Sequence, residues 1–245
     1  MMKRSSPAWR IFAILAVFAL ATPRPGATEP ESLDRNLEYT VTDLRGKLVR
    51  ESPDPTAKLK IGATAHSGEV LKAGWYSRAE LSVVSHRARF KISARSRVRL
   101  AGDRPGVLLE LEQGRIRAIF DHFEGDEPPE RRVVTPSAIL AVRGTEYGVS
   151  VSRAGITTVV VFAGVVEINT VIKTAGPVLV SAGQSCTVRP GQVPSTPQKH
   201  MMQRDDWDRG RAPGPMPGKT GSEQHPRQGG RESAPGGRMS GGGRG

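Results

Sequence analysis

Six basic side chains occupy odd-numbered positions of the segment RARFKISARSRVRL, residues 87–100. Successive side chains of a β-strand point to opposite faces, so an extended segment here would bury its apolar or small residues and expose a basic row. The row consists of Arg87, Arg89, Lys91, Arg95, Arg97 and Arg99. Such groups bind phosphates and carboxylates, which makes the row a candidate surface for lipid A phosphates, an acidic glycan or an acidic protein. The alternative is a solvated face whose charges prevent edge-to-edge aggregation.

No combination of residue types in the sequence indicates catalysis. The five histidines are far apart, and there is no H-E-x-x-H, G-x-S-x-G or P-loop motif. His122 lies beside Asp121 and near Glu124, but adjacent loop positions seldom close around a metal. We therefore expect a protein that is not an enzyme and that has no catalytic residues, no metal and no cofactor.

Cys186 is the only cysteine, which excludes an internal disulfide. Its surroundings, QSCTVRP, have the pattern of a final strand. A small buried thiol is therefore expected, in preference to a reactive one. An intermolecular disulfide is the alternative.

The elements that must position these residues are short strands. From Tyr39 to Arg189, strand-like runs alternate with turn signals about every 8–12 residues, which is typical of an all-β domain. The signal is densest in residues 133–170, where Val, Ile, Thr, Tyr and Phe dominate. Four pairs of turn-forming residues divide this stretch into at least four strands: Thr135-Pro136, Arg143-Gly144, Ala154-Gly155 and Ala163-Gly164.

The segment VLLELEQGRIRAIF, residues 107–120, alternates on both sides of Gln113-Gly114. A hairpin at these two residues would place Glu112 opposite Arg115 and Glu110 opposite Arg117. If the domain is a coiled solenoid, Gln113-Gly114 is a corner instead and the facing pairs differ.

Residues 133–195 also carry a family resemblance. The motifs TP-x-A, V-R-G-T with a following aromatic residue, a Gly-Val turn and A-G-Q occur in this order, and together they resemble the second half of a FecR domain. Residues 57–84 resemble the first half more loosely, so the likeness covers roughly residues 40–195. The motif residues, for which we expect mainly structural roles, are Thr135, Pro136, Arg143, Gly144, Thr145, Gly183 and Gln184.

The resemblance implies an all-β fold, a FecR-type β-solenoid or roll of many short strands. Gly144 would permit a bend, and Arg143 would hydrogen-bond neighbouring carbonyls or Glu146. The alternative role for Arg143 is recognition of a carboxylate or phosphate. FecR proteins resemble periplasmic sensors of iron uptake with a cytoplasmic anti-sigma segment, and only ten residues precede the apolar run here. We therefore expect a free-standing FecR domain without the anti-sigma segment.

The termini differ in composition from the predicted β domain. Residues 1–21 have the basic, apolar and small-residue regions of a signal peptide, with an uncleaved anchor as the alternative. Residues 22–38 are predicted to be a linker and residues 39–195 the FecR-like domain. Residues 196–245 are rich in Gly, Pro and Arg, so we expect disorder there.

Together these features predict a periplasmic or secreted protein of the cell envelope that acts as a protein- or ligand-binding module. Two alternatives are an accessory in signal transduction to a sigma-factor regulator and a structural or polysaccharide-associated envelope protein. The expected partner is an envelope protein or an anionic envelope polymer. The formal net charge of +12 is spread over both termini as well as the predicted β domain. The domain itself is therefore only mildly basic, and no nucleic-acid partner is expected. No transmembrane span is expected after signal cleavage, because the apolar run is shorter than the roughly 20 residues a bilayer requires.

Overall fold

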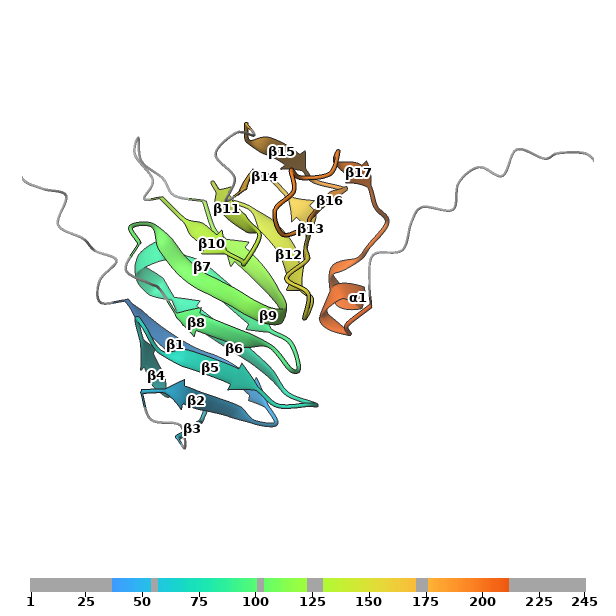
Figure 1. Ribbon diagram of the computed structural model, residues 1–245. Helices are drawn as coiled ribbons and strands as arrows, with labels where there is room; N and C mark the ends of the chain where they lie inside the picture. The colour runs from blue at the N-terminus through green and yellow to red at the C-terminus, as the bar shows by residue number, and fades with distance from the viewer. Residues whose placement is uncertain (1–36, 54–56, 101–103, 123–129, 171–175, 212–245) are drawn as a thin grey trace, which may run out of the picture. The chain divides into compact units, whose positions relative to one another are not determined.

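Seventeen β-strands and two short helical segments make up the described part of the computed structural model (Figure 1). The structure describes residues 37–53, 57–100, 104–122, 130–170 and 176–211. The predicted signal peptide, nearly all of the predicted linker and residues 212–245 of the predicted disordered tail lie outside the described residues.

The strands form two sheets that share one long strand, β9 (Val107–Phe120). Sheet A consists, in spatial order, of β4 (Thr64–His66), β1 (Glu38–Arg45), β6 (Arg78–Val83), β7 (Ala88–Ile92), the second half of β9, β12 (Glu146–Val151), β13 (Thr157–Ala163), β16 (Gln184–Val188) and β17 (Gln198–Lys199). Sheet B consists of β3 (Lys58–Leu59), β2 (Leu48–Ser52), β5 (Val70–Ala73), β8 (Arg97–Leu100), the first half of β9, β10 (Arg132–Val134), β11 (Ala138–Val142), β14 (Val165–Thr170) and β15 (Val178–Ser181). A 3-10 turn, Val84–His86, and the helix α1, Arg204–Asp208, complete the elements.

The strand β9 changes sheets at Gln113-Gly114. Gln113 pairs with Arg97 of sheet B, whereas Gly114 pairs with Val151 of sheet A. Gly114 has φ +101°, and a Cβ there would lie 2.4 Å from the Cα of Ser96, so a larger residue is excluded by both conformation and space. The hairpin predicted at this position is therefore wrong, and the corner is correct.

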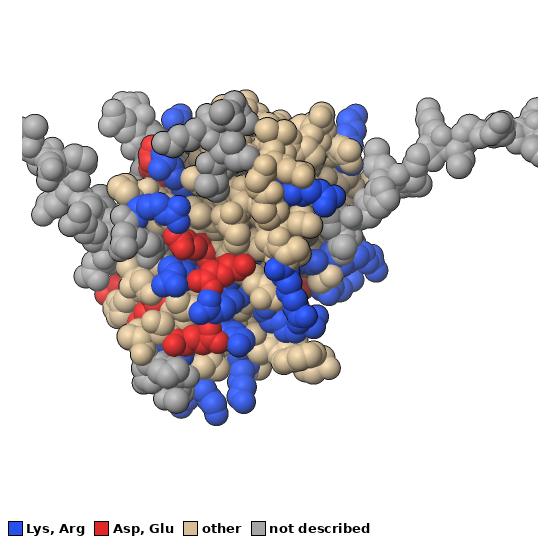
Figure 2. Space-filling model, in the orientation of Figure 1, with Lys and Arg blue, Asp and Glu red and all other residues tan. Residues whose placement is uncertain are grey.

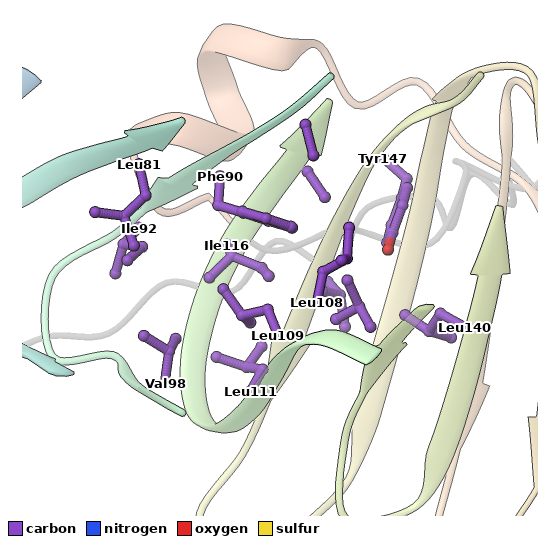
Figure 3. Packing of buried hydrophobic residues seen from close by; sticks show 14 of the residues in the cluster. Leu81, Phe90, Ile92, Val98, Leu108, Leu109, Leu111, Ile116, Leu140 and Tyr147 are labelled. Atoms are coloured by element: carbon purple, nitrogen blue, oxygen red, sulfur yellow. The ribbon is translucent and has the colours of Figure 1, made fainter. Parts of the chain in front are cut away.

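One apolar core lies between the two sheets. It takes alternate residues of β9, including Leu109, Leu111 and Ile116, together with inward side chains from both sheets (Figure 3). The hydroxyl of Tyr39 in sheet A donates to the carbonyl of Leu108 in the first half of β9, which joins the sheets through a buried polar contact. Alternation along short strands is what allows each sheet to bury one face only.

The predicted all-β class is confirmed, but the stacked turns of a solenoid are not. Among the described strands, β9 and β10 form the only parallel pair, and every other pair is antiparallel. Short connections reverse the chain direction, whereas parallel neighbours require a crossover. Here the second half of β9 lies in sheet A, so the chain visits the opposite sheet before it returns to sheet B as β10.

The prediction of disorder from residue 196 onwards differs from the structure over residues 196–211. This segment contains β17, which pairs with β16, and α1, whose Trp207 is fully buried. The sequence of residues 196–211 has no apolar periodicity from which order could be predicted. A single large side chain, Trp207, provides the contact that anchors the segment.

Candidate functional site

The alternation predicted for residues 87–100 is correct at most positions. Ala88, Phe90, Ile92, Val98 and Leu100 are buried in the core. The basic row, however, is divided between β7 in sheet A and β8 in sheet B, with Arg95 in the turn between them. The two sheets face each other across the core, so the two halves of the row lie on different outer faces.

On sheet B, the basic residues of the row form a ladder with carboxylates from neighbouring strands. Arg97 contacts Glu51 and Glu112, and Arg99 contacts Glu112 at 3.4 Å and Glu110 at 3.9 Å. The face therefore shows alternating blue and red groups in Figure 2. Lys72 and Arg104 extend the ladder at its two ends.

The ladder neutralises much of its own charge. Hydrogen bonds from Arg97 and then Lys72 hold the pKa of Glu51 below its usual value. Paired cross-strand charges of this kind are typical of a solvated sheet face. Binding of an anionic partner to the row remains a prediction.

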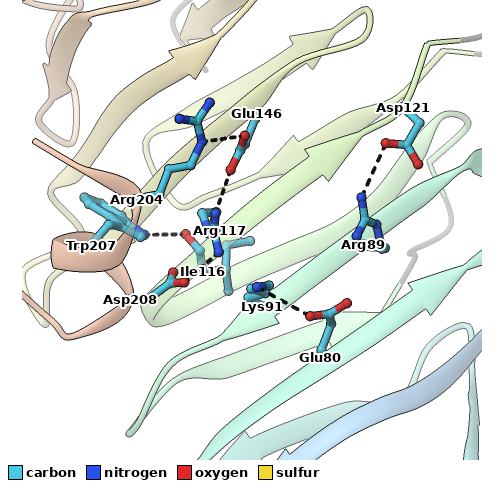
Figure 4. Close-up of polar contacts among 10 residues, drawn as sticks. All are labelled: Glu80, Arg89, Lys91, Ile116, Arg117, Asp121, Glu146, Arg204, Trp207 and Asp208. Atoms are coloured by element: carbon cyan, nitrogen blue, oxygen red, sulfur yellow. Dashed lines mark hydrogen bonds and ion pairs between the residues drawn. The ribbon is translucent and has the colours of Figure 1, made fainter.

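The half of the row on sheet A is also engaged. Arg89 contacts Asp121 at 3.4 Å and Lys91 contacts Glu80 at 3.7 Å (Figure 4). Arg87 donates to the carbonyl oxygen of His122 at 3.0 Å.

The most buried ion cluster of sheet A centres on Arg117, which the sequence suggested only as a hairpin partner of Glu110. Its two terminal nitrogens contact Glu146 and Asp208, each at 2.6 Å, and its side chain is 8% exposed (Figure 4). Arg204 contacts the second oxygen of Glu146 at 2.7 Å. Because Asp208 and Arg204 belong to α1, the cluster joins the C-terminal segment to sheet A.

Trp207 is the apolar anchor of the same segment. Its indole nitrogen donates to the carbonyl of Ile116 at 3.0 Å (Figure 4). Its ring lies under the guanidinium of Arg115, 4.5 Å from the ring centre. Phe162 meets the ring edge-on at 6.4 Å. A lone Trp between charged residues in a Gly- and Pro-rich segment was the one sequence signal that could have indicated this contact.

The Thr135-Pro136 motif has a structural role. Ser137 donates to Thr157 at 2.7 Å, Thr157 donates to Thr135 at 2.9 Å, and Thr135 donates to the carbonyl of Ala138 at 3.0 Å. All four residues are buried. The chain of hydroxyl groups therefore closes the turn before β11 and ties it to β13.

The second motif forms the corner between β11 and β12. Gly144 adopts φ +62°, as expected for a bend, and Thr145 donates to the carbonyl of Val165 at 3.0 Å. Arg143 is exposed and has no hydrogen bond or ion pair within the described part of the chain, so its predicted bond to Glu146 is wrong. Arg117 and Arg204 occupy that carboxylate instead.

The A-G-Q motif turns the chain from β15 to β16. Gly183 adopts φ +78°, and the side-chain oxygen of Gln184 accepts a hydrogen bond from the Ser181 amide at 3.0 Å. Both residues therefore shape a turn, as expected.

Cys186 is a buried free thiol, as predicted. Burial raises the pKa of this thiol. Within the described ranges, no three His, Cys, Asp or Glu side chains gather into a group that could hold a metal ion. No helix in those ranges has the length and hydropathy needed to cross a bilayer.

Apolar side chains are exposed at one edge of sheet B. Leu179 of β15 is 61% exposed and Val165 of the neighbouring strand β14 is 44% exposed. Both lie on the outer face, and Leu179 pairs with Glu167 in the register. Within the described residues, β14 is the only paired neighbour of β15, so the outer backbone groups of β15 form an edge.

The chain was compared with known sequences, structures and families. No curated protein sequence matches it. Two crystal structures, at 2.50 and 1.65 Å resolution, of a protein from Parabacteroides distasonis ATCC 8503, provisionally described as an anti-sigma factor, are similar to it at 14% identity and a TM-score of 0.43. The similarity covers 53% of this chain and 59% of that one, which is less than two thirds of its length.

The family model described as FecR protein matches residues 69–167. These residues run from the end of the turn before β5 into β14, and they include β9 and every motif of the resemblance except A-G-Q. Residues 69–167 of this chain are therefore similar to the FecR family, and the predicted family resemblance is confirmed over this stretch.

Proposed function

We propose that this protein is a non-enzymatic binding module of the cell envelope that recognises another envelope protein through the edge strand β15. The observation that carries the proposal is the exposed apolar patch of Leu179 and Val165 at the edge of sheet B. An edge strand with unpaired backbone groups accepts an added strand from a partner, and apolar side chains beside it supply specificity.

The four sheet edges differ in their suitability for this role. The edge strands β3 and β17 have two residues each and include Lys58 and Lys199, and β4 has three residues. Lysine and short length are common means of preventing unwanted pairing at an edge. The strand β15 has four residues, VLVS, and no charge. It is therefore the edge of the described sheets best suited to accept a strand.

Location in the envelope rests on the signal-peptide pattern of residues 1–21. A periplasmic or secreted protein with this edge would meet other exported proteins or the exposed domains of membrane proteins.

The test compares Leu179→Lys with Val193→Lys. Both side chains are 61% exposed, but Val193 belongs to the loop between β16 and β17 and not to the edge strand β15. Purified wild-type and variant proteins would be crosslinked to envelope fractions, and the captured proteins compared. We expect a partner that the wild type and Val193→Lys capture equally and that Leu179→Lys loses. Equal capture by all three proteins would contradict recognition through β15.

A second candidate function is an accessory in signal transduction, and the FecR match over residues 69–167 favours it. In that case the captured partner would be a membrane-embedded regulator of a sigma factor. Capture of cell-wall polymer without protein would instead support a structural role, which sedimentation with purified cell wall would measure.

A further inference from the structure

We propose that one corner of the fold, formed by the turns between β1 and β2, β5 and β6, and β7 and β8, docks on an anionic lipid bilayer. The corner consists of Arg45, Lys47, Trp75, Tyr76, Arg78 and Arg95. It shares only Arg95 with the basic row, and it is separate from the β15 edge.

Backbone hydrogen bonds hold the three turns together. The amide of Gly74 donates to the carbonyl of Lys47 at 2.9 Å, and the amide of Arg95 donates to the carbonyl of Gly74 at 3.0 Å. The buried hydroxyl of Ser77 accepts from the Lys47 amide at 2.8 Å. The side chains of this corner therefore project from a fixed framework, and the turn between β5 and β6 protrudes from the sheets in Figure 1.

Two large aromatic rings stand in solvent at this turn. Trp75 is 72% exposed and Tyr76 is 95% exposed. Tyrosine and tryptophan combine an apolar body with a polar group, and they concentrate at the boundary between membrane and water. A protruding turn with two adjacent rings can enter that boundary without moving the sheets.

Four cations belong to the same corner as the rings. Arg45 and Arg78 are directly opposite each other in the β1–β6 register, and both are exposed. Like charges placed opposite on neighbouring strands repel each other, unless an anion lies between them. The guanidinium of Arg95 lies 5.1 Å from the centre of the Trp75 ring.

These cations differ from those of the ladder on sheet B. In the described ranges, Arg45, Lys47, Arg78 and Arg95 make no ion pair, whereas the ladder residues have carboxylate partners. Asp43 and Glu80 form the next outward-facing pair of the β1–β6 register, and Glu80 is occupied by Lys91 at 3.7 Å. The corner is therefore a local positive surface, in contrast to the ladder, whose basic groups are largely neutralised.

A bilayer fits this arrangement better than a soluble anionic polymer does. A polymer chain is held in a groove or on a flat platform, whereas these rings project from a turn. Cations attracted to anionic headgroups and aromatic rings inserted beside them are the two contributions that a peripheral membrane contact combines.

The test uses the full chain with vesicles of phosphatidylcholine, alone or mixed with phosphatidylglycerol. We expect co-sedimentation with the mixed vesicles that weakens with added salt. A double variant with Arg45→Gln and Arg78→Gln should bind the mixed vesicles with a partition coefficient about 25-fold lower than that of the wild type. Each cation near an anionic surface contributes about five-fold to this coefficient. The matched control is Arg143→Gln with Lys199→Gln, which removes two exposed charges from the other end of the sheets and should leave binding nearly unchanged.

Fluorescence reports whether Trp75 enters the bilayer. The difference between the emission of the wild type and of Trp75→Phe isolates this ring, and we expect its maximum to shift to shorter wavelength with mixed vesicles only. Equal loss of binding in both charge variants, or an unshifted Trp75 signal, would overturn the proposal. Stronger binding to a soluble anionic polysaccharide, with competition against the vesicles, would also overturn it. Leu179→Lys should bind vesicles like the wild type, so failure of the β15 proposal is distinguishable from failure of this one.

Discussion

The indole ring of Trp207 lies directly on the backbone of Gly148. A Cβ at position 148 would be 2.3 Å from the Cε2 of Trp207, which is far closer than two carbon atoms approach. The helix α1 can therefore pack on sheet A only because a glycine stands in the middle of β12. The contact joins two residues that are distant in the sequence and lie in segments of very different composition.

Gly148→Ala should destabilise the fold by about 2 kcal/mol, because the added methyl overlaps the ring. Trp207→Ala should cost roughly 3 kcal/mol through the loss of a fully buried side chain. Urea unfolding followed by circular dichroism would measure both. In the double variant the methyl has no ring to meet, so the two effects should be far from additive. Additive effects would contradict the contact.

Arg117→Ala should destabilise the fold by about 3 kcal/mol, since it leaves Glu146 and Asp208 facing each other without their buried cation. Arg99→Ala is the control. The Arg99 side chain is 39% exposed on the sheet B ladder, and its loss should cost about 0.5 kcal/mol. Thermal unfolding of the two variants under identical conditions would compare them. Equal losses would contradict the distinction between a buried cluster and a solvated ladder.

Tyr147→Phe should stabilise the protein by about 1 kcal/mol. The Tyr147 hydroxyl is fully buried and has no hydrogen-bond partner within the described residues, while its ring stacks on Phe120 at 6.1 Å. Tyr39→Phe provides the matched contrast. Tyr39 is equally buried but donates to the carbonyl of Leu108, so its variant should lose about 1 kcal/mol. Chemical denaturation should show these opposite signs, and the same sign for both would refute the assignment.

Alkaline pH should destabilise the wild type more than Tyr147→Phe. Burial raises the pKa of Tyr147 above its ordinary value, so the folded state retains a proton that the unfolded state releases near pH 10. The contribution of Tyr147 to the free energy of unfolding is thus fully present below about pH 10. Above that pH it falls by up to about 1.4 kcal/mol per pH unit. Urea midpoints between about pH 8 and 11 would measure the difference. Parallel curves for the two proteins would exclude this linkage.

Gly114→Ala should lower the free energy of unfolding by about 3 kcal/mol. Alanine disfavours the positive φ of this position, and its Cβ would also overlap the backbone of Ser96. Gly62→Ala separates the two contributions. Gly62 has φ +82° but no atom within 4 Å of an added Cβ, so its variant should lose only about 1 kcal/mol. If the two variants unfold at the same denaturant concentration, the corner does not depend on the space at Gly114.

Local patterns in the sequence predicted the strands and the turns. Alternation along residues 87–100 placed Phe90 and Val98 in the core, because side-chain direction in a strand depends only on position along it. The turn residues Thr135 and Gly144 were identified because their chemistry suits a turn whatever surrounds them. The FecR resemblance of the same motifs rested on these local features.

Only the tertiary structure decided which sheet each strand joins. The alternation of residues 107–120 is the same in a hairpin and across a corner, and pairing with Arg97 on one side and Val151 on the other selected the corner. For the same reason the basic row is divided between two faces, and its carboxylate partners come from strands as distant as β2. Trp207 and Gly148 meet because β17 joins sheet A beside β16, which only β13 separates from β12. Contacts of this kind depend on sequence separations that no local pattern encodes, and they determine which surfaces of this protein remain open to a partner.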